Sequence, residues 1–195
     1  TRCSRDWSSD VCSSDLLSKT WKDFSASSAV GQDRILQALV TILPLAFFVQ
    51  LLFGATMRHT GAGLAIPDFP LSFGHWVPET FTSAIFIHYG HRVGAFTMVL
   101  LVSLTVFRIY QRHLLNLTLM AVGGLLAAFV ALQIMMGAFI IWLRKPVPIT
   151  SAHLVVGACC LATSVLLAVL VRRHANEIQT SGFSKTDSSG QWVTQ

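Results

Sequence analysis

The chain has 195 residues, of which 53% are hydrophobic and only 12% are charged, and its mean hydropathy is +0.60. These few polar side chains cannot cover a water-soluble globule, so lipid must cover part of the surface. The formal net charge of +5 could indicate a nucleic-acid partner, but the basic residues lie at the ends of apolar runs, where they orient helices in a membrane. The composition therefore predicts membrane lipid, and no nucleic acid, as a partner.

The first 16 residues, TRCSRDWSSDVCSSDL, are rich in Ser, Asp and Cys and lack the apolar core of a signal peptide. They resemble translated sequencing-adapter DNA and are interpreted as artefactual or disordered, and the chain is accordingly expected to be a fragment. Residues 17–34 follow as a cytoplasmic flank. With Cys3 and Cys12 set aside, the adjacent Cys159 and Cys160 point to different sides of a helix, so no disulfide framework is predicted.

Four apolar stretches are long enough to cross a bilayer, which requires about 20 helical residues. They cover residues 35–57, 81–107, 117–143 and 150–171. The short junctions after the second and third stretches predict antiparallel neighbours. The predicted fold class is an all-α integral membrane protein, a four-transmembrane-helix bundle over residues 35–171, followed by a disordered cytoplasmic tail over residues 172–195.

Basic residues near the span ends are divided unequally between the two sides of the membrane. One side carries Arg34, Arg108, Arg112, Arg172 and Arg173, and the other carries Arg58, Arg144 and Lys145. Because Lys and Arg are enriched on the cytoplasmic side, both termini are expected in the cytoplasm, with a bacterial inner membrane as the location.

The first and third stretches end in the same pattern, Q-x-x-x-G-A, at residues 50–55 and 133–138. The next helix in each case opens with a histidine that is followed shortly by Gly-Ala, at His91 and His153. The bundle is therefore interpreted as two repeated helix pairs, related by a pseudo-twofold axis along the membrane normal. This arrangement makes the two histidines face each other.

The depth of the two histidines agrees with this interpretation. His91 lies 16 residues before the predicted span end at 107, and His153 lies 18 residues before the end at 171, or roughly 24 and 27 Å. Ionisable residues inside a span are costly and indicate function, and two imidazoles at one level can bind a haem iron from opposite faces. The alternative role is hydrogen bonding between helices. His88, one turn from His91, is a competing ligand without a counterpart in the second copy.

Residues near the two histidines complete the candidate site. Gly94 and Gly157 lie on the histidine faces and could leave room for a flat macrocycle, although small residues also serve close helix packing. Haem propionates need cations near the membrane surface. Arg92, inside the span, is the strongest candidate and Arg58 a further one, whereas Arg144 and Lys145 suit interfacial anchoring.

The loop over residues 58–70 is too rich in Gly and Pro to be helical, and its apolar residues suggest that it folds back as a lid over the site. These apolar residues are Leu64, Ile66 and Phe69. The remaining histidines, in this loop region and in the basic flanks, are expected to be solvated; they are His59, His75, His113 and His174.

The loop sequence R-H-T-G-A-G-L-A-I-P-D-F-P-L resembles the R-x-T-G-S-G-L-x-C-P-D-W-P-L-C signature of haem A synthases. Members of that family have eight transmembrane helices in two similar halves, each half with one histidine on its second helix and one on its fourth. The resemblance covers one half, residues 35–171, and implies that His91 and His153 are a haem-ligand pair. The family oxidises haem O to haem A for terminal oxidases, with one half holding a haem b.

Two departures from the family pattern indicate which half this is. The substrate half usually has a glutamate three residues before the second-helix histidine, where this chain has His88. The two loop cysteines of the signature are replaced by Ile66 and Ser72. Both departures favour the carboxyl-terminal half, which binds the cofactor.

The resemblance therefore implies the haem b-binding half of a haem A synthase-like oxidoreductase, expected to bind haem b (iron) without making haem A alone. Its catalytic residues stay unknown. The implied partners are the missing amino-terminal half, haem O and a haem O synthase. The alternatives are a self-contained four-helix b-type cytochrome that carries electrons and a non-haem membrane scaffold or transporter.

Overall fold

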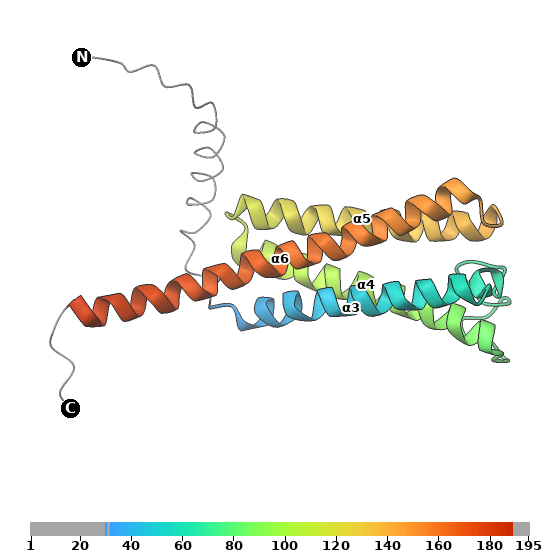
Figure 1. Cartoon of the computed structure of the whole chain (residues 1–195), viewed down its shortest axis with the longest axis horizontal. Helices are drawn as coiled ribbons and strands as arrows, with labels where there is room; N and C mark the ends of the chain where they lie inside the picture. Colours follow the sequence, from blue (N-terminus) through green and yellow to red (C-terminus); the bar gives the residue numbers. More distant parts are fainter. Residues whose placement is uncertain (1–29, 31, 189–195) are drawn as a thin grey trace, which may run out of the picture.

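The computed structural model describes residue 30 and residues 32–188, with side chains up to residue 173. The segment predicted over residues 1–16, most of the flank 17–34 and the end of the tail lie outside this part. Four long helices dominate it: α3 (Arg34–His59), α4 (Ser83–His113), α5 (Leu117–Trp142) and α6 (Val147–Ser188). A short 3-10 helix, η1 (Ala62–Leu64), lies between α3 and α4. Figure 1 shows the four long helices side by side.

Three of the helices begin after a residue whose side chain accepts a hydrogen bond from the first turn. Asp33 accepts from the Leu36 N–H, Thr82 from the Ile85 N–H, and Asn116 from the Leu119 N–H. These N-caps satisfy backbone donors that a helix start leaves unpaired. The three observed helix starts lie within two residues of the starts of the predicted spans.

Two helix ends differ from the prediction. α4 continues past the predicted end at residue 107 to His113, because the flanking residues are good helix formers and contain neither Gly nor Pro. α6 continues to Ser188, so the prediction of disorder from residue 172 differs from the structure over residues 172–188. A helix that is already nucleated adds further residues cheaply, and the first Gly after the span is Gly182.

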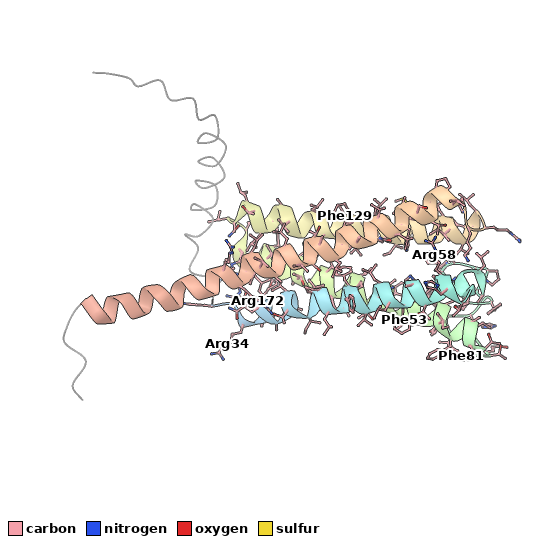
Figure 2. All side chains as sticks on the ribbon, viewed as in Figure 1. Arg34, Phe53, Arg58, Phe81, Phe129 and Arg172 are labelled. Carbon is pink, nitrogen blue, oxygen red and sulfur yellow. The ribbon has the colours of Figure 1, made fainter. Side chains whose placement is uncertain are left out.

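The four-helix membrane bundle is confirmed. Each long helix contains a segment apolar and long enough to cross a membrane, Val147–Arg173 in the case of α6. Large apolar side chains such as Leu45, Phe86 and Phe107 are more than half exposed on the outer surface, where a soluble protein would carry polar groups. Figure 2 places Arg34 and Arg172 at one end of the bundle and Arg58 and Phe81 at the other.

The helices form a closed ring in which α3 packs against α4 and α6, and α5 packs against the same two helices. The buried core is concentrated in the half of the bundle that contains the start of α3 and the end of α4, with Leu36, Leu43, Ile109, Leu119 and Leu167 fully enclosed. The other half, next to the long α3–α4 loop, is less filled. This uneven packing leaves room for a site at the loop end.

The end of the bundle where α3 begins and α4 ends contains a buried polar cluster that was not predicted from the sequence. His113, predicted to be solvated, is only 6% exposed, and its Nε2 lies 3.1 Å from Oδ2 of Asp33. Arg108 donates from Nε to the same oxygen at 2.9 Å and from Nη2 to Oδ1 at 3.0 Å. The prediction was wrong because α4 is longer than expected, and its last turn therefore packs His113 against the start of α3.

The α3–α4 loop folds back on the bundle, as its apolar residues predicted. Ile66 is fully buried and Phe69 is partly buried, whereas Leu64 is 37% exposed and does not join the packing. The loop also contains the turn η1, although Gly and Pro argued against any helix there. Short 3-10 turns tolerate such residues because they need few consecutive hydrogen bonds.

Candidate functional site

A cavity of about 230 Å³ lies between all four helices at the loop end of the bundle. Its floor is formed by core residues such as Phe47, Met98 and Val130, and its opening lies near the α3–α4 and α5–α6 connections. The exposed surface of the lining is largely apolar. Nine polar side chains also line the cavity: Gln50, Arg58, His88, His91, Arg92, Gln133, Lys145, Thr150 and His153.

His91 on α4 and His153 on α6 both line this single cavity and are both partly buried. Within the described part of the chain, neither Nε2 makes a hydrogen bond, so both are free to bind a ligand in the cavity. His153 Nδ1 is buried without a partner. A role as hydrogen-bonding contact between helices is therefore possible for the His91 ring, through Gln50, but has no support for the ring of His153.

The glutamines of the repeated pattern contact the histidines of the following helices. The Gln50 amide nitrogen donates to the His91 carbonyl at 2.8 Å, and the Gln133 amide nitrogen donates to the His153 carbonyl at 2.7 Å. The sequence showed both glutamines as part of a repeat but gave them no role. The structure shows that the repeat encodes the same interhelical contact twice.

The two predicted glycines lie beside these glutamines. A Cβ at Gly94 would clash with Oε1 of Gln50, and a Cβ at Gly157 would lie 3.1 Å from Nε2 of Gln133. Gly94 is not among the residues that line the cavity, whereas Gly157 is. The space at Gly94 is thus occupied by the Gln50 side chain, and only Gly157 stays a candidate for contact with a ligand.

Arg92 lines the cavity, but its two terminal nitrogens bind the loop. They donate to the carbonyl oxygens of Leu71 at 2.8 Å, Asp68 at 2.6 Å and Ile66 at 3.3 Å, while the buried Nε has no partner. The guanidinium also lies 5.8 Å from the centre of the Phe69 ring. Arg92 therefore holds the lid in place, a role that the sequence did not reveal.

His88 also fastens the lid and lines the cavity. It is 3% exposed, and its Nδ1 accepts a hydrogen bond from the Ile66 N–H at 3.2 Å. This contact occupies the ring nitrogen that faces the loop. The bond to the loop therefore distinguishes His88 from His91 and His153, whose rings make no hydrogen bond to the loop in the described part of the chain.

The turn at the far end of the loop is organised by Asp68. Its carboxylate accepts from the backbone N–H of Phe73 at 2.8 Å and of Gly74 at 2.9 Å, both in left-handed conformations. Burial alone would raise the pKa of this carboxyl, but the two N–H donors and the charge of Arg92 together lower the pKa below its ordinary value.

Changing Arg92 to Met is expected to loosen the lid. A hydrogen bond to a charged group contributes about 1.5–3 kcal/mol, so amide hydrogen exchange over residues 66–71 should accelerate about tenfold or more. The matched control is Arg144→Met, because Arg144 is an exposed cation outside the cavity lining. Equal exchange rates in the wild type and both variants would show that the Arg92 contacts do not hold the loop.

Cations surround the opening of the cavity. Arg58 and Lys145 are exposed side chains that line it, and Cε of Lys145 lies 2.7 Å from the position of a Cβ at Gly63. Lys145 was expected only to anchor the chain at the membrane surface. Its position follows from the tight α5–α6 connection, where Arg144 and Lys145 both have positive φ.

Among the described residues, no group of three or more His, Cys, Asp or Glu side chains could hold a metal ion by itself. Two imidazoles supply too few ligands for a bare metal ion. They are sufficient for an iron whose other four ligands come from a porphyrin. The donor set and the apolar cavity therefore fit a haem better than a free metal.

Comparison with known proteins identifies the family. The COX15-CtaA family, described as cytochrome oxidase assembly protein, matches residues 14–165. A heme A synthase of Listeria monocytogenes serovar 1/2a is 30% identical over 141 residues, which cover 71% of this chain and 45% of that protein. A heme A synthase of Shouchella clausii is 40% identical over 62 residues, 32% of this chain and 21% of that protein. The chain thus spans less than half of the length of these relatives. It belongs to the COX15-CtaA family of cytochrome oxidase assembly proteins.

Proposed function

We propose that this chain is the haem b-binding half of a haem A synthase-like membrane oxidoreductase, in which His91 and His153 would hold the haem iron. The single observation that carries the proposal is their position: they come from matching places in two repeated helix pairs and line one apolar cavity. Family membership supports haem as the cofactor, because relatives are named heme A synthase. When bound, haem b supplies a one-electron redox centre.

The chain's own residues would divide the work of binding. His91 and His153 would hold the iron through Nε2, and the apolar walls would exclude water. Arg58 and Lys145 at the opening would meet the propionates, and Arg92 would add its buried Nε, which has no partner among the described residues. Gly157 contributes space on α6. In this proposal the charged groups would lie near the membrane surface, and the iron would lie deeper in the bundle.

The assignment to the cofactor half depends on His88. Where a catalytic half would carry a carboxylate, this chain has an imidazole that binds the loop backbone. We infer that haem O is oxidised in a partner half and that this half passes electrons. A haem O synthase is the proposed source of the substrate, and a bacterial inner membrane with both ends in the cytoplasm is the proposed location.

One observation favours a second candidate, a self-contained b-type cytochrome that carries electrons. Both proposed ligands and the whole cavity lining come from this one chain. A haem held by these residues would need no ligand from another half. The two candidates share the haem site and differ in whether the electron is used for haem A formation.

Co-expression distinguishes the two candidates. The chain is produced with a four-helix amino-terminal half from a heme A synthase, and haem A is measured by chromatography of extracted haems. Haem A above the level given by either half alone supports the proposal. A folded, haem-loaded pair that makes no haem A favours the electron carrier, and purified chain without a Soret band overturns haem binding altogether.

A further inference from the structure

The His91 ring has one hydrogen-bond partner among the described residues, the side chain of Gln50. The amide nitrogen lies 3.2 Å from Nδ1 and also donates to the His91 carbonyl at 2.8 Å. The Gln50 side chain thus spans from α3 to both the ring and the backbone of one residue on α4. The absence of a side chain at Gly94 leaves the space that the Gln50 amide occupies.

The second copy of the repeat lacks half of this contact. Gln133 donates to the His153 carbonyl at 2.7 Å, but it makes no hydrogen bond to the ring, and His153 Nδ1 is buried without a partner. In both repeats the glutamine therefore binds the backbone of the histidine, but only in the first repeat does it also contact the ring. Among the described residues, Gln50 is the one hydrogen-bond partner of either proposed ligand ring.

We propose that Gln50 is a positioning residue that sets the ring orientation and ligand strength of His91. This inference rests on the proposed function, in which His91 binds iron. Histidines that bind metals are usually oriented by a hydrogen bond at their other ring nitrogen, and that bond changes the electron donation to the metal. Gln50 is the group in contact with this nitrogen.

An amide suits this position because it carries both a donor and an acceptor. The bond to the His91 carbonyl identifies the nitrogen as the donor in this structure, so the ring nitrogen Nδ1 is the acceptor. A histidine that binds iron through Nε2 carries its proton on Nδ1 and needs an acceptor there. If the iron binds at Nε2, the Gln50 amide would turn over and present its oxygen to Nδ1–H, giving up its bond to the His91 carbonyl. A methionine side chain offers neither the donor nor the acceptor.

The test compares the two glutamines in the full chain. Gln50→Met and Gln133→Met have similar volume and each remove the carbonyl contact, but only the first removes a contact to a ring. In Gln50→Met, we expect haem to be retained, with a shifted midpoint potential and a shifted largest g value of the low-spin ferric signal. Gln133→Met should leave both values within experimental error of the wild type.

A charge variant gives the sign of the effect. Gln50→Glu accepts from Nδ1–H more strongly, which makes the imidazole a better donor and should lower the midpoint potential below that of the wild type. If Gln50→Met does not fold, the direction in which the midpoint potential of Gln50→Glu shifts decides the test. Equal shifts in the two Met variants, or a raised potential in Gln50→Glu, would overturn the proposal. Absence of haem from the wild type would instead show that the proposed function fails.

Discussion

Changing His91 or His153 to Ala is expected to remove the Soret band of the purified protein almost completely. Loss of a residue that only hydrogen-bonds to a metal ligand already weakens metal binding about 10–100-fold, so loss of the ligand itself should weaken binding further. The third histidine that lines the cavity, His88, binds the Ile66 N–H of the loop through Nδ1, and it is not expected to leave the loop and replace either ligand. The measurement is the ratio of Soret to protein absorbance after purification in detergent.

The chain provides its own controls for this experiment. His59 and His75 are exposed residues outside the cavity lining, so His59→Ala and His75→Ala should keep the full Soret band. Thermal unfolding of the His91 and His153 variants, compared with haem-free wild-type protein, separates loss of ligand from loss of fold. Full haem retention in a folded double variant would mean that the two histidines only connect helices, as in the scaffold alternative.

The repeated pattern allowed much of this architecture to be predicted from sequence. Span length and hydropathy predicted the four helices, and the recurrence of a histidine after Q-x-x-x-G-A placed His91 and His153 in corresponding helices. Both signals are local, because they depend only on neighbouring residues and on helix geometry. The structure confirms the helices and brings both histidines to one cavity.

The contacts of polar side chains could not be predicted in the same way. Gln50 and His91 are 41 residues apart, and Arg92 binds carbonyl groups 21–26 residues earlier in the chain. Such pairings depend on helix rotation and loop conformation, which hydropathy does not encode. The role of Gly94 was misjudged for the same reason, since only the packed structure shows that Gln50 fills its space.

Changing Asp33 to Asn is expected to cause a large loss of stability. The Asp33 side chain is 6% exposed and binds both Arg108 and His113, which connects the start of α3 to the end of α4. Removing one partner of a buried ion pair typically costs about 3 kcal/mol or more, because the other charge stays buried without compensation. Asn can still cap α3, so Asp33→Ala should cost about 1 kcal/mol more through loss of the bond to the Leu36 N–H.

The same cluster predicts a pH dependence. Burial would raise the pKa of Asp33, but hydrogen bonds from Arg108, Leu36 and His113 and the charge of Arg108 lower the pKa to about 2 from an ordinary 3.8. A depressed carboxyl pKa stabilises the folded state above the ordinary value, and this stability is lost as pH falls from about 4 towards 2. The thermal midpoint of the wild type in detergent should therefore approach that of Asp33→Asn over this interval.

Arg112→Gln, which removes an exposed cation on the same turn of α4, should behave as the wild type. A constant difference between wild type and Asp33→Asn down to pH 2 would show that the charge of Asp33 does not hold the two helices together.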